Sequence, residues 1–247
     1  MKLEGKIIIV TGSGGLIGRE VVRYCRESGA EAVVGVDIDR PNRWGELPDV
    51  AYDVTDPAQI DALVNYVIQK YGRIDGLVNA AYPRTSDWSA RFEDIPYESW
   101  QKNVDMQLNA VFLICQKVLA VMKKQGSGSV VNFGSIYGVV GNDFTIYEAY
   151  GGTSPAGYAA IKGGIINFSR YLASYFGPYG VRVNCVSPGG VFDNQRPEFV
   201  KAYSHKSPLK RMARPEEMAP GVAFLLSDES SFITGHNLMI DGGWTAI

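Results

Sequence analysis

The stretch Thr11-Gly12-Ser13-Gly14-Gly15-Leu16-Ile17-Gly18 decides how this chain folds. It follows an apolar run at 6–10 and opens a segment, 16–27, in which apolar residues recur at helical spacing until Gly29. An apolar run, a glycine-rich turn and an amphipathic segment predict a strand, a tight turn and a helix in that order. The start of the chain is therefore expected to form one strand-turn-helix unit.

The same alternation continues to the end of the 247-residue chain. Further strands are predicted at 32–36, 50–54, 75–79, 129–133, 181–186 and 237–240, and further helices at 57–71, around 100–123, at 155–175 and at 215–226. Short apolar strands that alternate with helices imply a parallel sheet covered on both faces. We therefore predict an α/β protein with a three-layer, doubly wound, Rossmann-type fold and a seven-stranded parallel sheet, formed by residues 1–247 as one domain.

The charge and cysteine content exclude several classes of function. Lys and Arg number 24 against 26 Asp and Glu, so the net charge of −2 provides no basic surface for nucleic acid. No uninterrupted run of about 20 apolar residues is present, so we expect no membrane span. Cys25, Cys115 and Cys185 lie far apart in apolar segments, which is typical of reduced thiols in a cytoplasmic protein. His205 and His236 are also far apart and no CxxC motif occurs, so no metal site is expected.

The glycine-rich turn predicts a dinucleotide site. Glycines at this place in a Rossmann unit let the backbone approach a pyrophosphate, and the helix N-terminus favours its negative charge. The residues expected to contact it are Gly12, Gly14, Gly15, Leu16, Ile17 and Gly18.

Asp37 ends the next strand, about 20 residues beyond the glycines, where a carboxylate accepts hydrogen bonds from an adenosine ribose. Because a carboxylate repels a 2′-phosphate, Asp37 favours NAD over NADP. Arg19 and Arg40 lie near enough in the sequence to tolerate a phosphate, and a solvated strand-end carboxylate is the other interpretation of Asp37.

Two further strand ends belong to the same predicted site. Asp53 and Val54 close the third strand, and Asn79, Ala80 and Ala81 close the fourth. Ligands of open α/β sheets collect at the carboxyl ends of the strands. Asp53 could bond an adenine amino group and Asn79 with Ala80 could line the ribose, although ordinary turn or capping roles account for either residue equally well.

Tyr158 and Lys162 predict a proton-transfer site. They are four positions apart on an expected helix, so the phenol and the ammonium share one face. A nearby cation favours phenolate and lowers the pKa of a phenol toward neutrality. Ser135 ends the preceding strand, where its hydroxyl can hold a substrate oxygen against the phenol. An amphipathic surface pair is the alternative for Tyr158 and Lys162 taken alone.

These residues together resemble the short-chain dehydrogenase/reductase family along nearly the whole chain. The resemblance also covers Pro188, Gly189 and Val191 after the sixth strand and 241–243 near the end. It implies an NAD(P)-dependent oxidoreductase that interconverts a secondary alcohol and a ketone. Tyr158 would be the general acid/base, Lys162 would lower its pKa and hold the nicotinamide ribose, and Ser135 would orient the substrate oxygen.

Four positions depart from the family's pattern. Leu16 stands where short members usually carry glycine, and Gln107 replaces the asparagine that supports a water-mediated proton relay to the lysine. Asp193 replaces a threonine that commonly holds the nicotinamide carboxamide. Ser135 and Tyr158 are 23 positions apart, about ten more than is usual.

The extra residues lie in 141–154, whose Tyr, Thr, Asn and Asp side chains suit a polyhydroxylated substrate. An inserted surface or interface loop is the alternative interpretation. The stretch 187–195 and this insertion resemble dehydrogenases of sugar-modification and flagellin-glycosylation pathways, which favours a sugar or polyol. The residues expected at the substrate are Tyr147, Tyr150, Asp193 and Asn194.

Several alternatives remain open. Arg84 and the basic residues of 196–210 could bind an acidic group of the substrate or form a solvated helix face. Trp88 is expected to pack in the core or between subunits. A 3-oxoacyl thioester reductase is a second enzymatic interpretation, and a non-catalytic dinucleotide-binding regulator is a third. The resemblance suggests a homotetramer or homodimer formed through helices 100–123 and 155–175.

Overall fold

The computed structural model describes residues 3–38, 45 and 48–247 and contains one seven-stranded parallel sheet. The strands are β1 (Ile7–Thr11), β2 (Ala32–Asp37), β3 (Val50–Ala51), β4 (Gly76–Asn79), β5 (Gly128–Phe133), β6 (Val181–Pro188) and β7 (Asn237–Ile240). Their order across the sheet is β3-β2-β1-β4-β5-β6-β7. The predicted doubly wound α/β fold is therefore confirmed.

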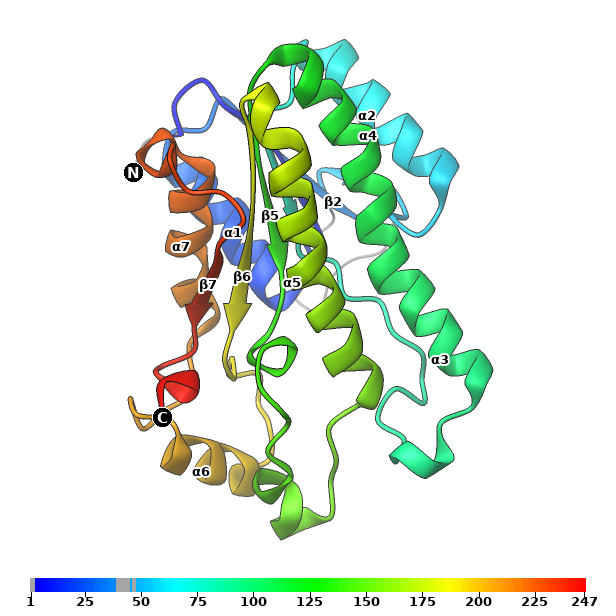
Figure 1. Ribbon diagram of the computed structural model, residues 1–247, viewed down its shortest axis with the longest axis vertical. Helices are drawn as coiled ribbons and strands as arrows, with labels where there is room; N and C mark the ends of the chain where they lie inside the picture. Colours follow the sequence, from blue (N-terminus) through cyan, green and yellow to red (C-terminus); the bar gives the residue numbers. More distant parts are fainter. Residues whose placement is uncertain (1–2, 39–44, 46–47) are drawn as a thin grey trace.

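Helices cover both faces of this sheet (Figure 1). They are α1 (Leu16–Glu27), α2 (Pro57–Tyr71), α3 (Tyr97–Val104), α4 (Ala110–Gln125), α5 (Ala156–Phe176), α6 (Pro197–Lys206) and α7 (Ala219–Leu226). Side chains alternate along β1, so Ile7 and Ile9 pack toward α2 and α4 while Ile8 and Val10 pack toward α1 and α7. Both faces are thus apolar, which explains why the strands read as continuous hydrophobic runs.

The third strand is shorter than the sequence predicts. Only Val50 and Ala51 pair with β2, at Val36 and Asp37, because β3 is the edge strand and has one neighbour. The chain then turns at Asp53, whose Oδ1 accepts hydrogen bonds from the N–H and hydroxyl of Thr55 at 2.8 and 2.7 Å. This turn ends the pairing before Val54.

The helix predicted around 100–123 contains an irregular turn. Between α3 and α4 the residues Asp105–Asn109 form a π-helical turn, the kind of interruption that often marks functional sites. The combined stretch Tyr97–Gln125 is long and apolar enough to cross a membrane by length and composition alone. Here its residues Ile114, Val118 and Leu119 are fully buried against the sheet, so it serves as a core helix.

The carboxyl ends of the strands form the functional end of the molecule. The strand order reverses between β1 and β4, and ligands of open α/β sheets bind outside such a switch point. In Figure 1 the strands point downward, and α6 lies with the green segment 141–154 below their ends. These two segments stand beyond the sheet edge at which the predicted site residues gather.

Candidate active site

A cleft of about 1110 Å³ opens at the carboxyl ends of the strands. Pockets for one small ligand usually measure about 300–1,000 Å³, so this cleft has room for a dinucleotide with a substrate beside it. Most residues predicted for the site line it, from the glycine-rich turn at one end to the inserted segment at the other. They are Gly12, Gly14, Gly15, Leu16, Ile17, Gly18, Asp37, Asp53, Val54, Ala80, Ala81, Ser135, Tyr147, Tyr158, Lys162, Pro188, Gly189, Val191 and Asp193.

The glycine-rich turn is held so tightly that side chains are excluded. Gly12 has a φ of +67°, and a Cβ there would lie 2.6 Å from the Cα of Ala81. A Cβ at Gly18 would lie 2.1 Å from the Gly12 carbonyl oxygen. Gly15 caps the N-terminus of α1 without a side chain, so no capping side chain occupies the first N–H groups of the helix. This cradle fits a pyrophosphate.

Asp37 stands beside this turn at the end of β2. Its Oδ2 accepts a hydrogen bond from the Gly14 N–H at 2.9 Å, and its Oδ1 accepts one from the Ile38 N–H at 2.9 Å. The carboxylate is therefore fixed in the cleft wall, where the ribose next to the pyrophosphate would lie. Arg40, named above as a possible phosphate ligand, lies outside the described residues.

Asn79 does not reach the cleft as predicted. Its side chain turns into the core and donates from Nδ2 to the Oδ1 of Asn132 at 2.8 Å, with the Cys115 sulfur at 3.4 Å. Neighbouring positions on a strand point to opposite faces of the sheet, and Asn79 occupies an inward position with 5 % exposure. The backbone of the next two residues, Ala80 and Ala81, lines the cleft in its place.

Ser135, Tyr158 and Lys162 come together at the other end of the cleft. Ser135 follows β5, while Tyr158 and Lys162 occupy one face of α5. The Lys162 Nζ donates to the carbonyl oxygen of Phe133 at 2.9 Å and lies 5.7 Å from the centre of the Tyr158 ring. The Ser135 Oγ accepts a hydrogen bond from the Tyr137 N–H at 3.2 Å. A hydroxyl, a phenol and an ammonium thus converge around one place in the cleft.

The direction of the Tyr158 pKa differs from the prediction. Burial raises the pKa of Tyr158, and a hydrogen bond with Ser135 opposes that rise. Burial also lowers the pKa of Lys162 to about 8. The lysine was expected to lower the pKa of the phenol, but both groups are withdrawn from water, which disfavours phenolate and ammonium alike.

Gln107 lies in the π-helical turn and does not line the cleft. Its side chain is 4 % exposed, and neither the amide oxygen nor the amide nitrogen has a hydrogen-bond partner among the described residues. Buried amides are almost always paired with protein groups or with water. The site is therefore suited to an ordered water, which is what a water-mediated relay requires.

A loop after β4 contributes three cleft residues, of which the sequence analysis named only Arg84 as a possible substrate ligand. Tyr82 packs edge-on against Tyr158 with ring centres 5.8 Å apart, and its hydroxyl accepts a hydrogen bond from the Trp88 Nε1 at 2.7 Å. The Arg84 guanidinium lies 5.1 Å from the centre of the Tyr82 ring. Trp88 lines the cleft and also packs against the buried cluster of Ile161, Ile165, Ile166 and Cys185, so the expected core contact is confirmed. The sequence signal that could have indicated Tyr82 is its position directly after Ala81, which was already expected to line the cleft.

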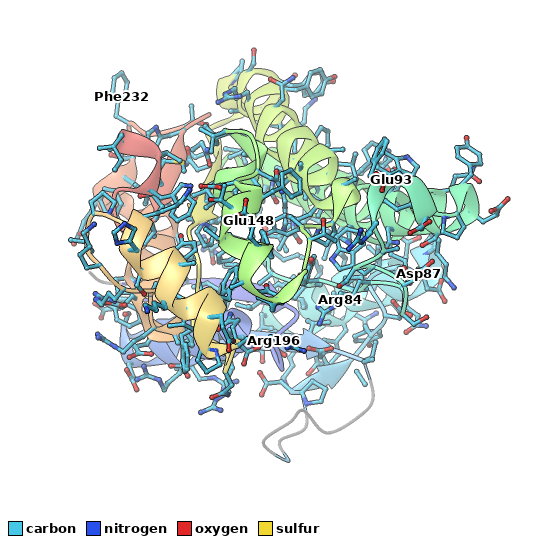
Figure 2. All side chains as sticks on the ribbon, turned by 90° about the horizontal axis from the view of Figure 1, so that it is seen from below. Arg84, Asp87, Glu93, Glu148, Arg196 and Phe232 are labelled. Atoms are coloured by element: carbon cyan, nitrogen blue, oxygen red, sulfur yellow. The ribbon has the colours of Figure 1, made fainter. Side chains whose placement is uncertain are left out.

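The inserted segment and α6 close the substrate end. Lys206 on α6 forms an ion pair with Asp143 and donates to the Thr145 hydroxyl at 2.7 Å. Figure 2 looks onto this end, with the insertion and α6 in front and Arg84 and Arg196 on the same side of the molecule. Of the predicted substrate residues, Tyr147 and Asp193 line the cleft, whereas Tyr150 and Asn194 do not.

A family model described as enoyl-(acyl carrier protein) reductase matches residues 13–245. The chain belongs to the short-chain dehydrogenase/reductase family. Members of this family act on CH–OH or C=O groups with NAD(P), and this chain is an oxidoreductase of that kind. The predicted enzyme class is therefore confirmed.

The chain is similar over its full length to members with different substrates. It is 31 % identical to the post-translational flagellin modification protein A of Campylobacter coli, covering 98 % of this chain and 99 % of that protein. It is 34 % identical to a 3-oxoacyl-acyl-carrier-protein reductase of Thermotoga maritima, with the same coverage. A short-chain dehydrogenase from Leptospira borgpetersenii, solved with bound NAD+, superimposes with a TM-score of 0.86 at 38 % identity, covering 99 % of this chain and 94 % of that one.

Proposed function

We propose that this protein is an NAD-dependent dehydrogenase that interconverts a secondary alcohol and a ketone on a sugar or polyol substrate. The observation that carries the proposal is one cleft with two chemically different ends. The glycine cradle and Asp37 form one end, and Ser135, Tyr158 and Lys162 form the other. We treat residues 1–247 as a single NAD-binding domain.

The residues fit this chemistry in defined roles. Bound NAD supplies the hydride acceptor, or the hydride in the reverse direction. The N-terminus of α1 would hold the pyrophosphate and Asp37 the adenosine ribose, whose hydroxyls can donate to the carboxylate. Pro188, which ends β6, lines the cleft with Gly189 and Val191, and these three residues would lie beside the nicotinamide.

Tyr158 exchanges the substrate proton. Ser135 donates a hydrogen bond to the substrate oxygen and Tyr158 takes or returns the hydroxyl proton as a general acid/base. The Lys162 ammonium, bonded to the Phe133 carbonyl, stands close enough to favour the phenolate once ligands occupy the cleft. Gln107 would hold the water through which the lysine exchanges protons with solvent.

The preference for NAD rests on Asp37. A carboxylate in the cleft wall would repel a ribose 2′-phosphate while accepting hydrogen bonds from an unmodified ribose. The 38 % identical relative solved with NAD+ supports the same preference. We infer NAD as the cofactor in preference to NADP.

The substrate assignment rests on the inserted segment. Tyr147 brings a phenol into the cleft and α6 holds the insertion in place, which suits a ligand with several hydroxyl groups. Similarity to a flagellin modification protein supports this class, while similarity to a 3-oxoacyl thioester reductase supports the alternative substrate. Asp37 weighs against the alternative, because such reductases generally use NADPH.

A screen of NAD and NADP reduction over sugars, polyols, hydroxy acids and simple secondary alcohols tests this proposal, with 3-oxoacyl thioester reduction as a separate arm. Turnover of a polyol or sugar with NAD is the expected result, and Tyr158→Phe should abolish it while NAD binding persists. Turnover confined to 3-oxoacyl thioesters would contradict the substrate class. If the parent protein binds NAD but converts nothing in the panel, a non-catalytic regulator becomes the better description.

We also propose a cytoplasmic homo-oligomer assembled through α4 and α5. Their outer faces carry a groove of about 290 Å³ lined by aromatic side chains, among them Phe112, Phe168, Tyr171 and Tyr175. Phe112, Tyr171 and Tyr175 are between 44 % and 61 % exposed, and an exposed apolar patch of this kind favours a subunit interface. Sedimentation of Tyr171→Asp should show smaller species than the parent protein.

A further inference from the structure

Five tyrosines line the substrate end of the cleft, and one of them differs from the others. They are Tyr82, Tyr137, Tyr147, Tyr158 and Tyr203. The Tyr82 and Tyr203 hydroxyls accept hydrogen bonds from the Trp88 Nε1 and the Gly190 N–H. The Tyr147 and Tyr158 hydroxyls interact with those of Ser154 and Ser135. The exception is Tyr137.

The Tyr137 hydroxyl is buried without a hydrogen bond. The residue is only 8 % exposed, and no described residue meets hydrogen-bonding geometry with its oxygen. The backbone N–H of Asp143 is near enough to oppose the rise in the Tyr137 pKa that burial causes. A backbone N–H can only use the phenol oxygen as an acceptor, so the phenol proton needs another group. The Tyr147 hydroxyl interacts with the Tyr137 hydroxyl, but the pair does not meet hydrogen-bonding geometry. A buried donor without an acceptor is costly and points to a group that binds there.

Tyr137 is held in a fixed position beside the reacting groups. It lies two residues after Ser135, and its N–H donates to the Ser135 Oγ at 3.2 Å. A Cβ at Gly138 would lie 2.7 Å from the carbonyl carbon of Lys162, so this turn packs directly on α5. The backbone that carries the phenol is therefore fixed against the residues that flank the reaction.

Tyr147 places a second phenol next to the first. It belongs to the inserted segment, packs in the same apolar cluster as Tyr137, and contributes to raising the Tyr137 pKa. Its neighbour Ile146 is 1 % exposed, which anchors this part of the insertion in the cluster. The two phenols thus face one region of the cleft from different parts of the chain.

We propose that Tyr137, with Tyr147 beside it, donates a hydrogen bond to a second oxygen of the substrate. This oxygen is distinct from the one bonded by Ser135 and Tyr158. The site then selects diols and hydroxy ketones over alcohols and ketones that carry one oxygen. The inference rests on the proposed function and adds a residue that determines substrate specificity.

Matched pairs of substrates test this role. We would measure kcat/KM with NAD for 1,2-cyclohexanediol and 1,3-cyclohexanediol, each against cyclohexanol, in the parent protein and in Tyr137→Phe. The parent should prefer at least one diol by about tenfold or more, since a site built to bond a hydroxyl rejects the analogue that lacks it. Tyr137→Phe should lower kcat/KM for that diol by about 10- to 100-fold and for cyclohexanol by less than about twofold.

Tyr203→Phe is the matched control. It removes a phenol from the same cleft wall whose hydroxyl already serves the Gly190 N–H, so it should affect diol and cyclohexanol equally. Thermal unfolding shows whether each variant folds. Should Tyr137→Phe fail to fold, Tyr147→Phe takes its place and is expected to reduce the diol preference in the same direction.

The outcomes separate this inference from the proposed function. Equal losses on both members of a pair, or a parent protein that turns over cyclohexanol as well as the diols, would overturn the role of Tyr137 and leave the dehydrogenase assignment intact. A parent protein that converts no member of any pair, nor any other alcohol of the screen, would overturn the proposed function and this inference with it.

Discussion

The buried ammonium of Lys162 costs stability when no cofactor is present, and the size of that cost can be worked out. Lys162 is 7 % exposed and its one hydrogen bond among the described residues is to the Phe133 carbonyl. Burial lowers its pKa from 10.5 to about 8. A difference of about 2.5 between the unfolded and folded pKa corresponds to about 3 kcal/mol.

The cost depends on pH in a definite direction. Below pH 8 the lysine is charged in both states, so the folded protein bears the whole penalty. Between pH 8 and 10.5 the unfolded chain binds more protons than the folded one, so stability rises with pH. The penalty is about 3 kcal/mol at pH 7 and falls to about 1 kcal/mol at pH 9.5.

Replacing Lys162 by methionine removes the charge and keeps most of the side-chain volume. The variant also loses the hydrogen bond to the Phe133 carbonyl, which reduces the gain in stability by about 1–2 kcal/mol. Lys162→Met should therefore raise the free energy of unfolding by about 1–2 kcal/mol at pH 7, and this gain should shrink by about 2 kcal/mol at pH 9.5. Turnover should be lost at both pH values.

Urea unfolding at pH 7 and at pH 9.5 measures the effect, without cofactor and at one protein concentration because assembly also stabilises the fold. Lys124→Met, which changes an exposed lysine of α4, is the control and should give the same small difference at both pH values. A stability difference between Lys162→Met and the parent that does not change with pH would refute the reasoning.

Three further changes test other parts of the site. Asp37→Ala should weaken NAD binding by about 10- to 100-fold and NADP binding much less, as measured by calorimetry, because it removes a charged acceptor of the ribose; unchanged NAD affinity would contradict its role. Gln107→Leu should lower kcat because it removes the amide that would hold the relay water, whereas Gln107→Asn keeps an amide and should retain more activity. Deletion of 142–152 removes Tyr147 and the Asp143 ion pair, so turnover should vanish while NAD affinity stays; retained turnover would show that the insertion is not part of the substrate site.

The sequence alone was enough to predict the parallel sheet and to predict that residues following different strands meet in one site. Parallel strands present their carboxyl ends at one edge, so residues that follow different strands, such as Asp37 and Ser135, are brought to the same cleft by topology. Tyr158 and Lys162 follow from helical spacing in the same way. These inferences need only the local periodicity of apolar residues and the order of the elements, and both can be read from the amino-acid sequence.

Side-chain orientation and burial could be learned only from the tertiary structure. Asn79 turns inward to Asn132 while Tyr82, three residues later, packs on Tyr158. The withdrawal of Lys162 from water, which sets its pKa, depends on contacts between distant segments. The unpaired hydroxyl of Tyr137 depends on them as well. The periodicity of the sequence determines the topology, and the topology brings the site residues to one edge of the sheet. Their burial and hydrogen bonding depend on tertiary packing between segments that are far apart in the sequence.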